Sequence, residues 1–142
     1  MKRFNKSFTQ QEAIPQVGID AAVKVLQSGR LHRYNTAPGE LGETARLEQE
    51  YAAFQGASYA LAVTSGGQAI QIALRAAGVS PGDKILANAY TLAPVPGAIY
   101  AVGAVPVFVE IGDDWLTDID DLRSKARESD AKFLMLSHMR GH

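Results

Sequence analysis

Cysteine is absent from the 142 residues of this sequence, and neither sign of charge is in excess. The absence of cysteine excludes disulfide frameworks, thiolate nucleophiles and cysteine-ligated metal sites. The 14 basic and 15 acidic side chains give a formal net charge of −1. Without a basic block, the chain is not expected to bind nucleic acid or an anionic membrane surface. Hydrophobic residues make up 46% of the chain, which is typical of a globular protein rather than a disordered one.

Targeting and membrane-spanning segments are also missing from the sequence. Lys2 and Arg3 are not followed by an apolar run, so no secretory signal is predicted and we expect a cytoplasmic protein. The stretch between Lys84 and Glu110 has no charged residue, but prolines and glycines interrupt it. These breakers predict a strand, a helix and a second strand rather than a helix that crosses a membrane.

The established phosphate and nucleophile motifs are absent as well. The sequence has no G-x-x-x-x-G-K-[ST] and no G-x-G-x-x-G, and Val63 stands where a nucleophile elbow centred on Ser65 requires glycine. Kinase-like, dinucleotide-binding and hydrolase functions are therefore not favoured. The histidines do not have the spacing of a metal site on a helix. The aspartates between residues 113 and 121 are interpreted as a solvated face and as helix caps.

A regular alternation of strand and helix patterns is present instead. Helices are predicted over residues 15–27 and from Glu43 to Gly56. The later pattern predicts strands over 59–63, 84–89, 105–111 and 132–137, and helices over 68–77, 95–102 and from Asp118 onwards. This succession predicts an α/β fold with a mainly parallel sheet and helices on both faces. We assign residues 1–42 to an N-terminal helix and irregular segment, and 43–142 to the first part of a large domain.

Three segments should line one crevice, because ligands of open α/β sheets bind beyond the carboxyl ends of the strands. They are Thr64 to Gln68, Asn88 to Leu92, and Ser137 with His138. In the first segment, glycines remove side chains that would keep a ligand from the backbone, and the following helix offers unpaired N–H groups and a positive dipole end. A phosphate fits there, although a tight turn without a ligand explains the same pattern.

Two residues of these segments have two interpretations each. Tyr90 is suited either to stack on a ligand or to fill the interior. His138 is placed either to line the crevice or to form a hydrogen bond at a strand end.

Taken in order, five segments resemble the DegT/StrS family of pyridoxal-phosphate sugar aminotransferases, which have the fold of aspartate aminotransferase. The segments are residues 59–66, 78–83, 89–91, 103–108 and 138–141. The resemblance implies that the chain is an incomplete part of the three-layer α/β/α large domain of a PLP-dependent transferase. It also implies a homodimeric parent that moves an amino group from glutamate or glutamine to a keto sugar, usually a nucleotide-linked one.

Carried over by position, the resemblance assigns residues that bind pyridoxal 5'-phosphate. They are Ser65, Gly66, Gly67, Gln68, Tyr90, Leu92 and His138. The first four correspond to the turn that holds the cofactor phosphate. Gly67 stands where the family has threonine, so one hydroxyl contact is lost unless Gln68 replaces it. Leu92 stands where the family usually has an aromatic residue on the ring, so an apolar cover is kept without aromatic stacking.

The resemblance also implies which groups these 142 residues do not include. The family places its Schiff-base lysine, and the aspartate that pairs with the pyridine nitrogen, later than His142. Lys84 and Lys132 lie at the amino ends of predicted strands, which is the wrong edge of the sheet for either to replace that lysine. We therefore expect an inactive N-terminal portion of an aminotransferase, a truncated product or a partial record, with sheet edges and apolar helix faces uncovered.

Two alternatives stay open on the sequence. One is a non-catalytic remnant, an interaction or phosphate-binding module that pairs with a separate C-terminal half. The other is an independent nucleotide-binding α/β domain. The sequence leaves open which sugar is the substrate, which of its positions is aminated and which compound donates the amino group. It also leaves open whether the parent is a dehydratase, as some relatives are.

Overall fold

The computed structural model describes residues 11–141. The N-terminal residues, from which the absence of a secretory signal was predicted, and His142 lie outside this range. The chain divides into a first compact unit that ends at Ala62 and a second that begins at Val63, and each is described by itself. The boundary predicted after residue 42 concerns parts of a larger domain and stays a prediction.

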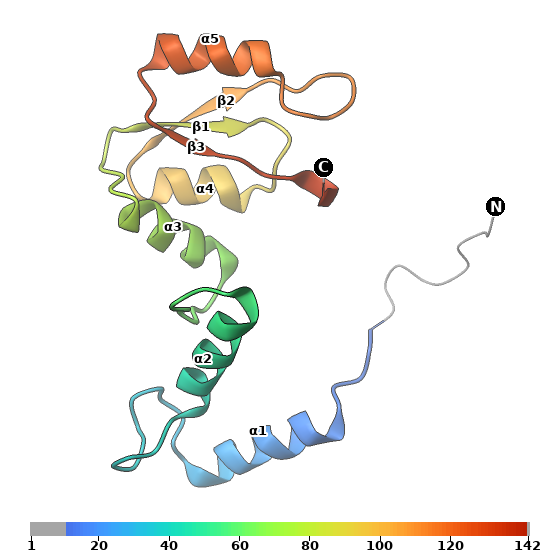
Figure 1. The fold of residues 1–142 in the computed structure, drawn as a ribbon, viewed down its shortest axis with the longest axis vertical. Coiled ribbons are helices and arrows are strands. Elements are labelled where there is room, and N and C mark those ends of the chain that lie inside the picture. The colour runs from blue at the N-terminus through green and yellow to red at the C-terminus, as the bar shows by residue number, and fades with distance from the viewer. Residues whose placement is uncertain (1–10, 142) are drawn as a thin grey trace, which may run out of the picture. The chain divides into compact units, whose positions relative to one another are not determined.

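The first unit contains the two predicted helices, α1 (Gln16–Ser28) and α2 (Glu43–Gln55) (Figure 1). An ion pair joins α2 to the irregular segment before it: Arg33 Nη2 donates to both carboxylate oxygens of Glu48, at 3.0 and 2.9 Å. Glu48 Oε1 also accepts a hydrogen bond from the main-chain N–H of Ala62 at 2.8 Å. One carboxylate on α2 therefore fixes the chain both before and after the helix.

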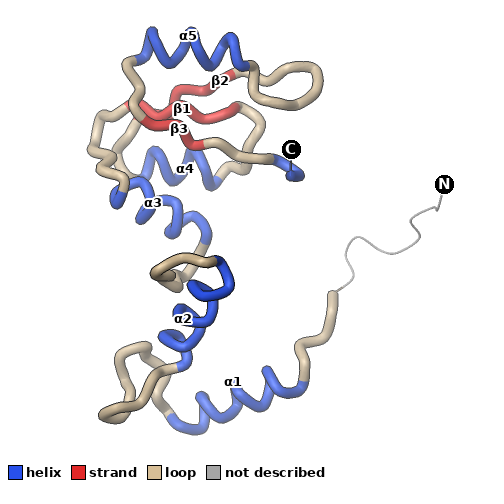
Figure 2. Tube along the Cα trace, in the orientation of Figure 1, coloured by secondary structure: helices blue, strands red, loops and turns tan. Residues whose placement is uncertain are grey.

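The second unit is a parallel sheet between helices. Its elements are α3 (Gly66–Ala76), β1 (Lys84–Asn88), α4 (Pro94–Ala101), β2 (Val105–Val109), α5 (Ile119–Ser129), β3 (Phe133–Met135) and the short 3-10 helix η1 (Met139–Gly141). The sheet order is β2-β1-β3, and both pairings are parallel. Figures 1 and 2 show α5 on one face of the sheet and α4 on the other, with α3 beside α4. This arrangement confirms the predicted α/β fold.

The centre of the core lies where β1 meets its neighbours. Residues 85–88 of β1 are buried, because this strand pairs on both sides and helices cover both of its faces. Ile85, Ile99 and Val109 are fully buried and come from β1, α4 and β2. Burial of a side chain of this size contributes about 1.5–3 kcal/mol, so the sheet and α4 are held together mainly by apolar contact.

The strand predicted over residues 59–63 is wrong. This segment has no regular structure, and the side chain of Tyr59 is 91% exposed. A strand is stabilised by hydrogen bonds to a neighbouring strand, and none of the three strands of the described sheet pairs with these residues. An apolar pattern alone does not make a strand where no partner lies beside it.

A glycine ends α4 for a steric reason. Gly103 has φ of +82°, and its N–H bonds to Tyr100 O at 2.9 Å while the next N–H, of Ala104, bonds to Ile99 O at 3.2 Å. These two bonds form a Schellman cap, which requires a left-handed residue. A Cβ at position 103 would also lie 3.0 Å from Cβ of Pro81, so both conformation and space demand glycine.

We expect Gly103→Ala to lower the free energy of unfolding by about 1–3 kcal/mol, because alanine disfavours positive φ and would clash here. Gly97→Ala is the matched control: Gly97 is inside α4 with nothing within 4 Å of an added Cβ, and alanine there should stabilise by about 0.5–1 kcal/mol. Urea unfolding followed by tryptophan fluorescence measures both. Equal effects of the two variants would contradict the steric account.

The helix α5 is fixed at its start by aspartates, as predicted. Asp118 is its N-cap, and its side chain accepts hydrogen bonds from the N–H groups of Asp120 and Asp121. Asp121 is not on a fully solvated face, however: its Oδ2 accepts from Glu110 N at 2.7 Å and pairs with Lys125 Nζ at 2.8 Å. The hydrogen bond from Lys125, and then that from Glu110, hold the pKa of the Asp121 carboxyl below its ordinary value.

This lowered pKa predicts an acid-sensitive contribution to stability. A carboxyl whose pKa is lower in the folded state contributes stability above its unfolded pKa, and that contribution is lost as the pH falls through the folded pKa. Asp121→Asn keeps an oxygen for Glu110 N but carries no charge, so the variant should lose less stability between neutral and acid pH than the original. Urea unfolding across pH tests this, with Lys125→Met as a control that should also flatten the profile. Parallel profiles for all three proteins would contradict the prediction.

Candidate functional site

The first candidate segment is the start of α3. Ser65 is the N-cap of this helix, and its Oγ accepts a hydrogen bond from Gln68 N at 3.1 Å. Its carbonyl accepts from Ala69 N at 3.0 Å. Serine is among the residues preferred at this position because its oxygen satisfies an N–H group that has no acceptor inside the helix.

Two glycines follow the cap and leave the backbone open. A Cβ at Gly66 would meet nothing within 4 Å, and one at Gly67 would meet only Ser65 Oγ, at 3.9 Å. Within residues 11–141 the N–H groups of these two glycines have no protein acceptor. Open space, two unpaired donors and the positive end of a helix dipole together fit an anion such as the phosphate of a cofactor.

The side chain of Gln68 contributes a further donor at this end of the helix. Its Oε1 accepts a hydrogen bond from Thr64 Oγ1. With the amide oxygen engaged in this way, the Nε2 group of Gln68 is left to donate. The residue is therefore suited to replace the hydroxyl that Gly67 does not provide.

The ends of β1 and β3 form the second part of the candidate site, and the structure brings them together. Asn88 Nδ2 donates to Tyr90 O at 2.6 Å and to Ser137 O at 3.2 Å, and Asn88 Oδ1 accepts from Ser137 N at 2.9 Å. The hydroxyls of Thr91 and Ser137 lie 2.6 Å apart. Leu92, 63% exposed, and the exposed His138 continue these two segments.

The hydrogen bonds of residues 64–68 that involve the turn stay within residues 64–69. The prediction that this turn shares one crevice with the two strand ends therefore stays a prediction.

One residue at this edge was missed by sequence reasoning. The ring of Trp115 lies 5.2 Å from that of half-buried Tyr90, centroid to centroid, with the planes inclined by 57°. Trp115 has φ of +67° and is 65% exposed, at the tip of a loop that Gly112 N closes with a 2.9 Å bond to Leu116 O. The only signal in the sequence was a lone tryptophan in a polar loop.

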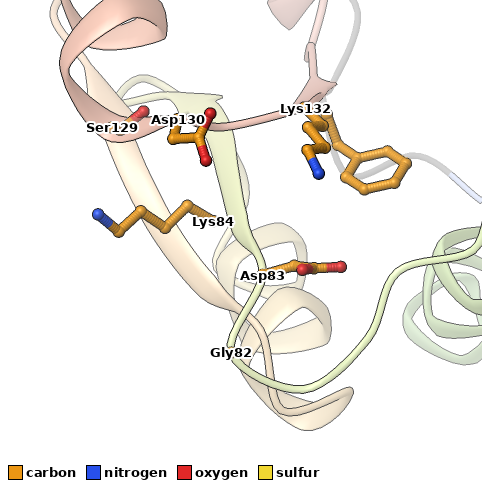
Figure 3. Close-up of a pocket in the computed structure, with 7 residues that line it drawn as sticks. Gly82, Asp83, Lys84, Ser129, Asp130 and Lys132 are labelled. Atoms are coloured by element: carbon orange, nitrogen blue, oxygen red, sulfur yellow. The ribbon is translucent and has the colours of Figure 1, made fainter.

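A cavity of about 210 Å³ lies at the opposite edge of the sheet (Figure 3). Its lining comes from the amino ends of β1 and β3 and comprises Gly82, Asp83, Lys84, Ser129, Asp130, Lys132 and Phe133. Figure 3 shows the side chains of Lys84 and Lys132 pointing in different directions. Both lysines therefore lie where the sequence placed them, away from the carboxyl ends of the strands.

Residues 11–141 contain neither a helix that could cross a membrane nor a cluster of side chains that could ligate a metal. No helix in this range is long and apolar enough to cross a bilayer. No group of three carboxylate or histidine side chains is placed to hold a metal ion.

The fold and the start of α3 define a class: an α/β domain with a parallel sheet and, at the start of a helix, an open glycine turn whose geometry fits an anion. The chain belongs to the DegT/DnrJ/EryC1/StrS aminotransferase family, whose sequence profile matches residues 15–142. This match confirms the resemblance found in the sequence.

Curated relatives cover most of this chain, but the chain covers little of them. It is 37% identical over 124 residues to dTDP-3-amino-3,4,6-trideoxy-alpha-D-glucose transaminase of Streptomyces venezuelae, a match that takes in 87% of the chain and 31% of that protein. It is 33% identical over 117 residues to the spore coat polysaccharide biosynthesis protein SpsC of Bacillus subtilis, across 80% of the chain and 28% of SpsC. The chain thus spans under a third of the length of these relatives.

Solved structures agree with the fold. DesV of Streptomyces venezuelae matches with a TM-score of 0.59 and 29% identity, over 83% of this chain and 38% of DesV. A Streptococcus pneumoniae protein described as a candidate sugar aminotransferase, in its PLP form, matches with a TM-score of 0.67 and 29% identity, over 79% of this chain and 27% of that one. An aminotransferase from Psychrobacter cryohalolentis, 20% identical, shares the fold over 96% of the chain and 40% of its own length, with a TM-score of 0.67.

The cap of α3 can be tested on stability alone. Ser65→Ala removes the oxygen that accepts from Gln68 N and should cost about 1 kcal/mol of unfolding free energy. Ser65→Asn supplies an equivalent side-chain oxygen and should leave stability within a few tenths of a kcal/mol of the original. Urea unfolding distinguishes the two variants. Equal stabilities of Ser65→Ala and Ser65→Asn would show that the cap bond does not matter.

Proposed function

We propose that the protein to which these residues belong is a PLP-dependent aminotransferase. It transfers an amino group from glutamate or glutamine to a keto sugar, a nucleotide-linked one, and acts as a homodimer in the cytoplasm. The family and its sugar-aminating relatives support this proposal. The single observation in the structure that carries it is the open glycine turn at the start of α3, which fits the cofactor's phosphate.

Each candidate residue has a defined task in this proposal. The N–H groups of Gly66 and Gly67 and the Nε2 group of Gln68 hold the phosphate, and Ser65 keeps the first turn of α3 in the required form. Pyridoxal phosphate, when bound, supplies the electron-withdrawing ring on which the amino group is transferred.

The strand ends contribute the remaining surfaces of the proposed site. Tyr90 and Leu92 supply apolar surface beside the ring, with no aromatic side chain at position 92 to stack on it. We place His138, which follows the end of β3, on the wall of the site opposite these two residues.

We further propose that the 142 residues alone bind the cofactor but do not catalyse transamination. On the family resemblance, neither the Schiff-base lysine nor the aspartate that pairs with the pyridine nitrogen has a counterpart among them. If the purified chain formed a borohydride-reducible lysine adduct with pyridoxal phosphate and transaminated, this part of the proposal would be wrong.

A second candidate is a non-catalytic module that pairs with a separate C-terminal half. Large apolar side chains exposed on α2 favour it, namely Leu47, Tyr51 and Phe54, since an exposed apolar stripe is typical of a surface that another chain covers. Recovery of a cofactor absorption band only after a C-terminal chain is added would support this candidate.

The phosphate turn can be tested with pyridoxamine 5'-phosphate, which lacks the aldehyde and forms no adducts with surface lysines. Trp115 is the single tryptophan and lies beside Tyr90, so binding should quench its fluorescence saturably. Ser65→Asp keeps the cap but adds a negative charge beside the phosphate, and should weaken binding at least about tenfold.

Ser65→Asn is the matched control, because it caps the helix without charge and should bind as the original does. Equal affinities of the Asp and Asn variants, or no quenching in the original protein, would contradict the assignment. Thermal stabilisation by a nucleotide and not by pyridoxamine phosphate would favour an independent nucleotide-binding domain instead.

A further inference from the structure

Asn88 is the one buried polar or charged residue in the described range, 11–141, with 3% of its surface exposed. It stands at the carboxyl end of β1, after three buried apolar residues of the same strand. An amide buried without partners costs several kcal/mol relative to water. The polar side chain at this position is therefore stabilised by the groups that it binds.

The bonds of Asn88 join two segments that are far apart in the sequence. Its amide bonds to both main-chain groups of Ser137, accepting from the N–H at 2.9 Å and donating to the carbonyl at 3.2 Å. Ser137 lies two residues beyond the end of β3, so the side chain continues the pairing of β1 with β3 past the last strand residue. The amide has one orientation that satisfies these groups, because an N–H requires the oxygen and a carbonyl requires the nitrogen.

The remaining hydrogen bond of Asn88 fixes its own chain. Nδ2 donates to Tyr90 O at 2.6 Å, which turns the segment after β1 at a defined place. The Thr91 and Ser137 hydroxyls, 2.6 Å apart, then join the two segments a second time. Both strand ends are thus held at one edge of the sheet by a single buried amide, reinforced by one pair of hydroxyls.

We propose that Asn88 is a positioning residue for the cofactor ring. It does not touch the ligand; it sets the backbone from which Tyr90 and Leu92 project on one side and His138 on the other. This inference rests on the proposed function, because those three side chains are the ones assigned to the ring. In this proposal two different residues order the two parts of the site. Asn88 holds the segments that surround the ring, and the Ser65 cap on α3 holds the turn that binds the phosphate.

The test exploits that separation. In Asn88→Ala, the affinity of the chain for pyridoxamine 5'-phosphate should fall by about tenfold. The affinity for inorganic phosphate, measured from the amide NMR shifts of Gly66 and Gly67, should not change. Ser137→Ala is the comparison variant, because it keeps both main-chain groups that Asn88 binds and removes only the reinforcing hydroxyl. It should lower the affinity for pyridoxamine 5'-phosphate less than Asn88→Ala does, and leave the affinity for phosphate unaltered.

Two results would overturn the proposal. A parallel loss of both affinities in Asn88→Ala would mean that the residue only keeps the unit folded, and an unchanged affinity for pyridoxamine phosphate would mean that it positions nothing. If the original chain binds no pyridoxamine phosphate, the proposed function fails first. Amide hydrogen exchange then still decides about Asn88. Its loss should speed exchange at Ser137 and Val95, whose N–H groups bond to Asn88 Oδ1 and to Leu92 O, and not at Ala69, whose N–H bonds to Ser65 O. Uniform or absent changes contradict the proposal.

Discussion

The parallel pairing of β1 with both β2 and β3 is the constraint on which the candidate site depends. Parallel strands direct all their carboxyl ends to one edge of the sheet, so residues that follow different strands are gathered there without any specific attraction between them. The buried apolar residues of β1 hold this pairing, with α4 and α5 covering its two faces. The segments after β1 and β3 are adjacent for that reason, and the hydrogen bonds of Asn88 join them directly.

The turn before α3 works by a different principle. In the proposed function it binds an anion through main-chain groups, so it needs small residues more than it needs particular side chains. The replacement of a threonine by Gly67, relative to the family pattern, changes the side-chain contacts but leaves the N–H donors in place. Gln68, held by Thr64, supplies another donor at the same end of the helix. Such a turn tolerates variation at single positions while its affinity for an anion stays with the backbone and the helix dipole.

The sequence predicted those parts of the fold that local chemistry decides. Asp118 at the start of α5 and the branched residues of β2 each act over a few positions, and their elements lie where the patterns placed them. The predicted strand over 59–63 failed because a strand depends on a partner elsewhere in the chain. The pairing of Asn88 with Ser137 spans 49 residues, and no spacing rule reveals it.

The aromatic contact of Trp115 was missed for a related reason. Its loop closes back on itself through bonds such as that of Gly112 N with Leu116 O, and a left-handed backbone at the tryptophan turns its ring towards Tyr90. A positive φ at a bulky residue is unusual and cannot be anticipated from composition. The family resemblance implied which cofactor to expect, and the structure shows how the two strand ends are joined.

The most direct test of the central claim is a crystal of this chain soaked with pyridoxamine 5'-phosphate. The account predicts density for the phosphate group against the main-chain nitrogens of Gly66 and Gly67, with the ring towards the ends of β1 and β3. A phosphate bound at the opposite edge of the sheet, beside Lys84 and Lys132, would contradict it.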